Sequence, residues 1–328
     1  MISLKPFNSF GVESFAKEMI QIQKEEDLIE VNYNEGYRIL GEGSNILLTQ
    51  NQAVIILKNE IKGIQILEEN DAYAYVKVGG GESWHSIVLW ALQHNLGGIE
   101  NLSLIPGSVG AAPVQNIGAY GVELKDVMVE LNGFHIPDRA FLKFTNPSCH
   151  FGYRTSIFKT ELKQNFFINS IVLKLTKKHV LQLNYGTILD ELNALKIDNP
   201  KIQDVSKAII KIRNSKLPNP AILGNAGSFF KNTSISRKEF NALKLQFPQM
   251  PGYSENDEFV KVPSGWLIDQ CGWKGRRKGD VGSYEKQALV LVNFGNASGF
   301  EILDFAMDII TSVKNRFGIE LTPEVNIW

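Results

Sequence analysis

The sequence predicts an α+β fold built from more than one domain. A chain of 328 residues, 44% of them hydrophobic, is long enough to bury two or three cores. Short runs of β-forming residues alternate with glycine-rich pieces in the first half, which is typical of strands. Segments whose apolar residues recur at helical spacing lie around them and dominate the second half. Together these features indicate mixed helices and strands.

The first half is expected to open with a helix and continue mainly in strands. Residues 14–30 have apolar side chains at helical spacing after Ser14, a residue that commonly opens a helix. Another helix over 83–94 is expected to end at Gly97 and Gly98 in a left-handed cap. Strands are predicted in six runs: YRIL (37–40), NILL (45–48), AVIILK (53–58), YAYVKV (73–78), DVMVEL (126–131) and FFINSIVLKL (166–175).

A predicted helix within 198–220 separates the two halves. Its apolar isoleucines have helical spacing, and Pro218 and Pro220 end it, so this stretch is a candidate hinge between domains. The second unit then begins. Ser236 and Glu239 have the spacing of a capping box at the start of another helix.

The C-terminal part predicts a buried strand, a long helix and a short tail. ALVLVNF (288–294) has the uninterrupted apolar character of a buried strand. Residues 298–317 have the apolar spacing of an amphipathic helix, which Gly318 closes. The tail returns as a strand-like piece and places Glu324 after a proline turn.

Composition excludes several classes of protein. Lys and Arg number 34 against 35 Asp and Glu, so the formal net charge of -1 lacks the basic surplus of a nucleic-acid-binding protein. Cys149 and Cys271 show no spacing of a zinc site or disulfide framework. No segment has the apolar length of a signal peptide or membrane span. We expect a cytoplasmic monomer that binds no metal, nucleic acid or membrane.

Two glycine-rich segments are the first candidates for a binding site. GEGSN (41–45) lies between two predicted strands, so it fits neither a dinucleotide fingerprint, which must open a helix, nor a P-loop; alone, it also suits a tight hairpin. IPGSVGAAPVQNIGAYG (105–121) consists largely of small residues and proline. Such a long loop suits a chain pressed against a large flat ligand, with backbone amides near phosphates.

Ser228 in GNAGSFFKN (224–232) is the third candidate. A nucleophilic serine is disfavoured, because no GxSxG pattern surrounds it and no histidine sits in a companion motif. Capping of a turn and proton donation both remain open. Taken alone, Arg154 in GYRTS and Glu324 in PEV read as ordinary solvated charges.

Five motifs in one order resemble the UDP-N-acetylenolpyruvoylglucosamine reductase family: IPGSVGAAPVQNIGAYG, GYRTSIFK (152–159), GNAGSFFKN, WLIDQCGWKG (266–275) and PEV (323–325). The likeness extends from about Asn8 to the last residue. LNYGTIL (183–189) is similar to the subtype whose tyrosine loop closes over the substrate. The resemblance implies reduction of UDP-N-acetylglucosamine enolpyruvate to UDP-N-acetylmuramate, a bacterial peptidoglycan precursor, by NADPH through bound FAD.

The resemblance also implies a fold and a cofactor site. The fold would be the FAD-binding fold of the vanillyl-alcohol-oxidase (PCMH) type in two α+β subdomains, 1–65 and 66–215. Residues 319–328 would complete the second, and 216–318 would form a smaller α+β substrate-binding domain. FAD would be held non-covalently by Gly41, Gly43, Ser44, Asn45, Ile105, Pro106, Gly107, Ser108, Val109, Gly110, Ala111, Gln115, Asn116 and Gly118.

By the same resemblance, three residues perform catalysis. Ser228 would donate a proton to the carbon beside the one that accepts hydride, which a well-aimed weak acid can do. Arg154 would stabilise charge on the substrate carboxylate through its planar fork, and Glu324 would lie beside that carboxylate. The UDP-sugar would be bound by Tyr185, Lys216, Asn232, Lys274 and Gln287.

Two positions depart from the family's pattern, and two other functions are considered. Asn326 stands where many relatives have arginine, and Thr155 where many have an acidic residue. One alternative is a related FAD-dependent sugar or alcohol oxidase, although neither glycine-rich segment holds a histidine or cysteine for covalent flavin attachment. The other is a non-catalytic UDP-sugar-binding protein, which the presence of all three catalytic residues disfavours.

Overall fold

The computed structural model describes residues 1–185 and 187–328, and its internal contacts divide the chain into two compact units. The inner unit consists of Ala16–Glu42 and Ala53–Ser215. The terminal unit consists of Met1–Phe15, Gly43–Gln52 and Lys216–Trp328. The chain therefore passes from one unit to the other inside the GEGSN segment, after Glu42.

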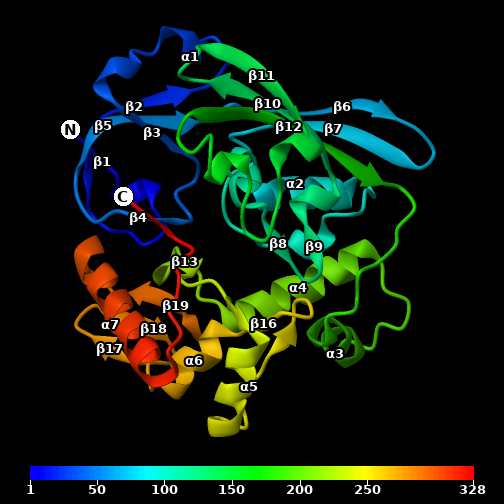
Figure 1. Ribbon diagram of the computed structural model, residues 1–328. Helices are drawn as coiled ribbons and strands as arrows, with labels where there is room; N and C mark the ends of the chain where they lie inside the picture. Colours follow the sequence, from blue (N-terminus) through cyan, green and yellow to red (C-terminus); the bar gives the residue numbers. More distant parts are fainter. The chain divides into compact units, whose positions relative to one another are not determined.

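A five-stranded antiparallel sheet is the framework of the inner unit. Its strand order is β11-β10-β12-β7-β6, and Figure 1 shows these strands side by side. A smaller sheet in this unit has the order β2-β5-β3, with β3 and β5 parallel. The elements are β2 (Phe15–Ile22), α1 (Asp27–Glu30), β3 (Tyr37–Leu40), β5 (Gln52–Asn59), β6 (Ile64–Glu69), β7 (Tyr73–Gly79), α2 (Trp84–Gln93), β8 (Gly118–Ala119), β9 (Val122–Glu123), β10 (Met128–His135), β11 (Ala140–Thr145), β12 (Phe166–Thr176), α3 (Gly186–Ala194) and α4 (Ile202–Lys216).

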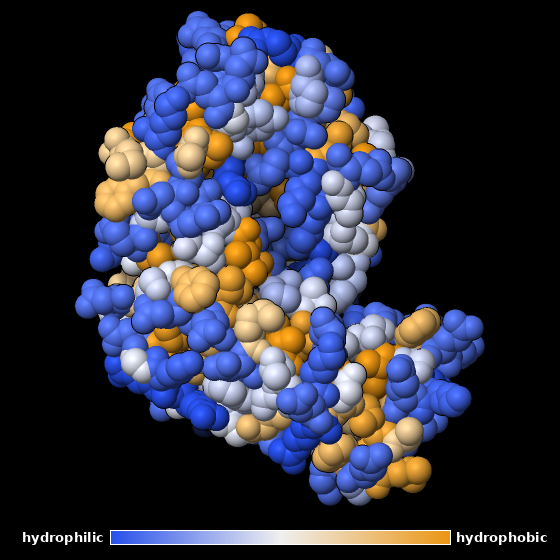
Figure 2. Space-filling view, turned by 60° about the vertical axis from the view of Figure 1, so that its left-hand side comes forward, coloured by the Kyte–Doolittle hydropathy of each residue, from blue (hydrophilic) through white to orange (hydrophobic). Residues whose placement is uncertain are grey.

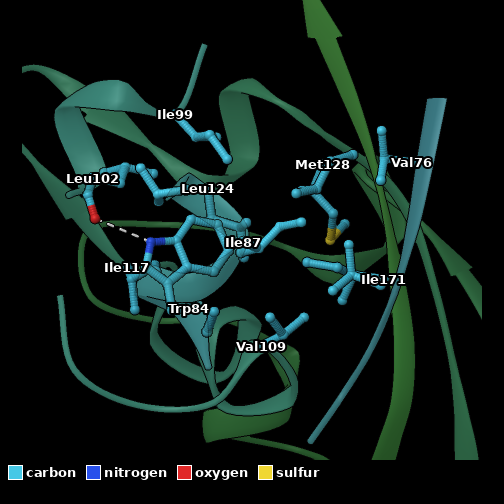
Figure 3. Close-up of a cluster of buried hydrophobic side chains, with 14 of the residues drawn as sticks. Val76, Trp84, Ile87, Ile99, Leu102, Val109, Ile117, Leu124, Met128 and Ile171 are labelled. Atoms are coloured by element: carbon cyan, nitrogen blue, oxygen red, sulfur yellow. Dashed lines mark hydrogen bonds between the residues drawn. The ribbon is translucent and has the colours of Figure 1, made fainter. Parts of the chain in front are cut away.

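The main core of the inner unit lies between α2 and the large sheet. Figure 3 shows Trp84 and Ile87 of α2 among side chains that include Val76 of β7 and Ile171 of β12. All four are essentially buried, and burial of each such side chain contributes about 1.5–3 kcal/mol. The indole nitrogen of Trp84 donates a hydrogen bond to the Leu102 carbonyl at 3.1 Å, so its one polar atom is satisfied.

The terminal unit contains two small antiparallel sheets and a two-stranded parallel pair. The strand orders are β13-β19-β18-β17 and β14-β16-β15, and the C-terminal strand β20 pairs with β4. The elements are β1 (Ile2–Ser3), β4 (Ile46–Leu47), β13 (Gly224–Ser228), β14 (Thr233–Ser236), α5 (Arg237–Gln246), β15 (Tyr253–Ser254), β16 (Phe259–Val262), α6 (Ser264–Gln270), β17 (Arg277–Lys278), β18 (Val281–Tyr284), β19 (Gln287–Asn293), α7 (Gly299–Phe317) and β20 (Asn326–Ile327).

Most predicted elements are confirmed, with the helices of the second half closest to expectation. Helix α4 matches the helix predicted before Pro218, and β19 matches the predicted buried strand. Ser236 and Glu239 form the expected capping box of α5. Helix α7 begins after a further capping box and ends at Gly318, whose φ of 71° gives the left-handed cap.

The predicted helix over 14–30 is wrong. The structure has strand β2 at Phe15–Ile22 and only one helical turn, α1, after it. In β2, Ala16 and Ile22 are buried and have the same parity, as side chains on one face of a strand do. Phe15, Met19 and Ile22 keep the helical spacing, but this segment pairs with β5 in a sheet, and that pairing decides in favour of a strand.

The end of α2 also differs from expectation. Asn95, with a φ of 55°, supplies the left-handed residue that was expected of Gly97 and Gly98. The Asn95 and Leu96 amides donate to the Leu92 and Ala91 carbonyls, the hydrogen-bond pattern of a Schellman cap. Asparagine tolerates this conformation because its short polar side chain bonds locally, so it can replace glycine there.

The compact units do not follow the predicted boundary at residue 65. Residues 43–52 belong with the C-terminal part, because β20 pairs with β4 and the Trp328 carbonyl accepts from the Thr49 amide at 2.8 Å. The tail 319–328 thus pairs with a strand from the first 65 residues, not with one from 66–215.

Hydrophilic side chains cover most of the face drawn in Figure 2, with hydrophobic ones scattered among them. Among the described residues, none of the helices combines the length and apolar character that crossing a bilayer requires.

Candidate active site

The two glycine-rich segments lie against each other in the inner unit. A Cβ on Gly41 would collide with the Ser108 hydroxyl, so only glycine allows this approach. Next to it, the carboxylate of Glu42 accepts a hydrogen bond from the Gly107 amide at 3.1 Å. The sequence-based expectation that these segments share a site is therefore supported for the part of GEGSN that belongs to this unit.

The long segment 105–121 is more ordered than a loop. Residues Val109–Gln115 form a 3-10 helix, and two of its amides are already used inside the unit. The Val109 amide donates to the Glu82 carbonyl at 2.8 Å and the Gly110 amide to the Gly80 carbonyl at 2.7 Å. The small residues thus serve close packing against the sheet, and these two amides are not available to a phosphate, contrary to the expectation for the whole segment.

Ser108 has spare capacity for a ligand. Its hydroxyl is buried, and among the described residues it has no hydrogen-bond partner. A buried polar group without a partner costs about 1–3 kcal/mol, so an incoming polar ligand atom beside Gly41 would be stabilised there. Elsewhere in the segment, Ile105, Pro106, Ala111 and Gly118 are at least partly exposed. The segment therefore fits a polar, flat cofactor such as a flavin nucleotide.

The Asn116 side chain holds the segment in place and is not available to a cofactor. With a φ of 43° and full burial, it donates to the Glu123 carboxylate (3.0 Å) and the Gly152 carbonyl (3.2 Å) and accepts from the Lys125 amide (3.0 Å). All of its side-chain capacity is directed inward. Contact between Asn116 and a cofactor would have to use its backbone.

Arg154 lies at the tip of a tight turn that is attached to this segment. Gly152 and Thr155 exchange backbone hydrogen bonds, and Arg154 between them has a φ of 55°. A left-handed conformation is strained for arginine and is typical of functional positions. Ser156 donates to the Val114 carbonyl (2.8 Å), Lys159 bonds Gln115 (3.2 Å), and Asn116 holds Gly152. Three side chains thus fix the arginine turn to the glycine-rich segment.

Arg213 is a functional candidate that the sequence analysis missed. It lies on α4, bonds the Tyr120 hydroxyl, and its Nε is buried without a partner in the described part of the chain. Burial lowers the pKa of Arg213, and the charge of Arg154 lowers it further against the effect of Tyr120. Two guanidinium groups in one neighbourhood attract an anion. Its position in the sequence could have indicated this. Arg213 follows the buried Ile209 by four residues, so it lies on the same, inward side of the helix.

His85 is a neighbour of Arg213. Its Nδ1 accepts a hydrogen bond from the Leu104 amide at 3.0 Å, which leaves the ring proton on the other nitrogen. Burial, together with the charge of Arg213, lowers the pKa of His85.

Tyr185, the predicted closing tyrosine, is 56% exposed just before α3. Its ring packs edge-on against that of Tyr120, with ring centres 5.9 Å apart. Asn101 donates to the Tyr120 and Gln182 carbonyls (2.8 and 2.9 Å), which ties the base of the tyrosine segment to the glycine-rich segment. The tyrosine can therefore meet a ligand of this unit.

Ser228 and Glu324 are brought together in the terminal unit. Glu324 donates its backbone amide to the carbonyl of Phe229, the residue after Ser228, at 2.7 Å. Phe230 and Pro323 form an antiparallel bridge beside it. Both predicted catalytic residues therefore lie on neighbouring backbone segments, although almost 100 positions separate them in the sequence.

The second part of GEGSN lies beside Glu324. The side-chain amide of Asn45 donates a hydrogen bond to the Glu324 carbonyl at 3.4 Å. The Asn45 carbonyl in turn accepts from the backbone amide of Asn326 at 3.1 Å and from its side-chain amide at 3.0 Å. Gly43 packs so closely on the Phe7 carbonyl that a Cβ would collide with it. Ser44, which lies between Gly43 and Asn45 in the chain, is half-buried. Asn326 thus holds the loop, a task for which its short amide suffices.

The predicted substrate residues of the terminal unit are only partly assembled. Asn232 accepts from the Ser264 amide at 3.2 Å, and Gln287 lies next to Gly265, so both are at the start of α6. Lys274 follows the other end of α6 and pairs at 3.7 Å with Asp269. Lys216 is exposed at the end of α4.

The fold and the first half of the site define a flavin-binding protein. A family model described as an FAD binding domain matches residues 21–133, from the end of β2 into β10, which include the glycine-rich segments. A second model, described as the C-terminal domain of UDP-N-acetylenolpyruvoylglucosamine reductase, matches residues 219–328, which include Ser228 and Glu324.

The chain belongs to the UDP-N-acetylenolpyruvoylglucosamine reductase family. It is 48% identical to the reductase of that name from Flavobacterium johnsoniae, over 99% of this chain and 98% of the relative. It is 43% identical to that of Pseudomonas aeruginosa, over 99% and 97%. The crystal structure of the Thermus caldophilus reductase, at 23% identity, superposes with a TM-score of 0.69 over 100% of this chain and 97% of that one, which supports the fold.

Proposed function

We propose that this protein uses NADPH to reduce UDP-N-acetylglucosamine enolpyruvate to UDP-N-acetylmuramate through non-covalently bound FAD. Family membership over the whole chain supports the reaction. The pairing of Glu324 with the residue after Ser228 is the observation that supports the assignment of these two side chains to catalysis. The product is a precursor of bacterial peptidoglycan, so the protein would act in the cytoplasm and support cell shape and division.

When bound, FAD would supply the transfer of hydride from NADPH to the terminal vinyl carbon of the enolpyruvyl group. The Ser228 hydroxyl would then donate a proton to the neighbouring carbon, which becomes basic when hydride adds. Arg154 would bind the substrate carboxylate and stabilise the charge that develops there, and Glu324 would help to orient it. Ser108 and the glycine-rich segments would hold the cofactor.

The remaining predicted residues would bind the rest of the substrate. Lys216 and Lys274 would meet the two phosphates, with Asn232 and Gln287 on polar groups of the nucleotide sugar and Tyr185 covering it. The proposed division of the chain assigns FAD binding to residues 1–65, 66–215 and 319–328. It assigns substrate binding to residues 216–318. We further propose that it acts as a monomer.

An anaerobic colour test distinguishes this function from its rivals. The purified protein should be yellow, should lose its colour with NADPH, and should regain it when the enolpyruvyl sugar nucleotide is added without oxygen. An oxidase would instead regain its colour only with oxygen. A binding protein without activity would take up the nucleotide and never oxidise NADPH, and either result would reject the proposal.

A further inference from the structure

Asn225 is a buried amide three residues before Ser228 whose side chain is used completely. It is 2% exposed. Its Nδ2 donates to the Leu223 carbonyl at 2.8 Å and to the Pro218 carbonyl at 3.2 Å, and its Oδ1 accepts from the Gly227 amide at 2.9 Å. The last of these bonds closes an Asx turn over the two residues that lead to Ser228.

The same turn contains a β-bulge. Asn225 pairs with Val292 and Ser228 with Val290, so three steps along β13 oppose two along β19. Side chains alternate along a regular strand, so Asn225 and Ser228 would otherwise lie on opposite faces. The extra residue places Ser228 on the face of its partner Val290, and bulges commonly redirect side chains in this way next to active sites.

The bulge depends on Gly227, whose conformation is not fixed by the packing of neighbouring atoms. Gly227 has a φ of 69°, and a Cβ there would meet no atom within 4 Å, so packing does not confine it. The hydrogen bond from its amide to the Asn225 side chain restrains the turn from the side of β13. Residues on either side are anchored: Gly224 packs on the Phe10 carbonyl, and Phe229 donates to the Leu289 carbonyl at 2.7 Å.

We propose that Asn225 is a positioning residue that fixes the β-bulge and thereby aims the Ser228 hydroxyl. This rests on the proposed role of Ser228 as proton donor. The bond to Pro218 adds a second consequence, because Pro218 lies two residues after Lys216 in the chain. One buried amide thus holds both the turn of the proton donor and the segment that follows a predicted phosphate-binding lysine.

The test compares Asn225→Ala with Asn219→Ala in the holoenzyme. Asn219 forms the same kind of Asx turn, accepting from the Ala221 amide at 3.0 Å. It is exposed, and in the described part of the chain its side chain makes no bond to the turn of Ser228. In anaerobic stopped-flow experiments, Asn225→Ala should slow reoxidation of the reduced flavin by the sugar nucleotide about 10- to 100-fold, since small misplacements have such effects. Flavin reduction by NADPH should stay at the wild-type rate, and Asn219→Ala should change neither rate.

A double-mutant cycle separates positioning from a general loss of structure. If Asn225 acts through the serine, Asn225→Ala should have little further effect in a Ser228→Ala background, because residues that act as one unit are not additive. Equal slowing in both backgrounds would overturn the proposal, as would a folded Asn225→Ala protein with wild-type reoxidation.

Two further outcomes remain distinguishable. If Asn225→Ala yields no soluble protein, Asn225→Ser replaces it in the same cycle, because a serine hydroxyl can accept from the Gly227 amide more weakly. The serine variant should show a smaller slowing, and a wild-type rate would reject the inference. If Ser228→Ala alone reoxidises at the wild-type rate, the role of Ser228 fails, and the positioning proposal fails with it.

Discussion

The inner and terminal units hold their predicted catalytic residues in different ways. In the inner unit, Arg154 occupies a strained turn that side chains fasten to the glycine-rich segment. In the terminal unit, Ser228 and Glu324 lie on segments joined by backbone hydrogen bonds. Side chains can be removed one at a time, whereas a backbone ladder survives substitution. Substitution of Ser228 should therefore lower activity without changing stability, while substitution of Arg154 should change both activity and stability.

The largest effect is expected for Ser228→Ala. Steady-state formation of UDP-N-acetylmuramate should fall about 100- to 10,000-fold, the usual loss for a positioned general acid. Melting temperature should stay close to wild type, because β13 keeps its backbone pairing. Product assays and thermal unfolding check both statements, and a marked loss of stability would contradict the contrast between the units.

Arg154→Gly should separate strain from function. Removing a guanidinium that stabilises developing charge should lower kcat about 100- to 1,000-fold. Glycine accepts a φ of 55° without strain, so the free energy of unfolding should not fall and should rise by up to about 1 kcal/mol. Denaturant titration measures this change. If Arg154→Gly unfolds more easily than wild type, the turn is not strained.

Gly110→Ala should disrupt the inner unit at its flavin segment. Its Cβ would come within 2.9 Å of the Ile168 carbonyl and 3.0 Å of the Gly80 carbonyl, both backbone atoms that cannot swing aside. Such overpacking costs about 1–3 kcal/mol. We expect lower stability in urea and loss of FAD during gel filtration. Wild-type retention of FAD would show that the close packing of this segment is not needed for the cofactor.

The smallest effect is expected for Lys216→Ala. A phosphate contact made equally in ground and transition states raises KM and leaves kcat unchanged, and one charged hydrogen bond corresponds to roughly 10-fold. Lys207→Ala, on the exposed side of the same helix α4, is the matched control and should keep the wild-type KM. An unchanged KM for Lys216→Ala would remove this residue from the site.

Local signals predicted the elements whose causes are local. The capping box at Ser236, the cap at Gly318 and the apolar spacing of α4 and α7 all depend on neighbouring residues, and the structure confirms them. The helix over 14–30 failed because β2 is decided by a partner strand far along the chain. The motifs likewise indicated Ser228 and Glu324, but no spacing rule predicts that their segments pair.

The residues that sequence reasoning missed act through contacts that are distant in the chain. Arg213 reads as one more charge on a helix until its bond with Tyr120 and the nearby Arg154 are known. Asn225 reads as a turn residue until the bulge opposite β19 is seen. Asn116 was assigned to the cofactor; its side chain supports the turn of Arg154, so a contact with the cofactor would have to use its backbone.

The central claim is that Ser228, placed by the terminal unit, acts only after the flavin has been reduced. The most direct measurement is an anaerobic single-turnover comparison of wild type and Ser228→Ala, with flavin absorbance followed first on mixing with NADPH and then with the enolpyruvyl sugar nucleotide. We expect a wild-type rate for the first mixing and a loss of at least about 100-fold in the second. Equal slowing of both steps, or of neither, would contradict it.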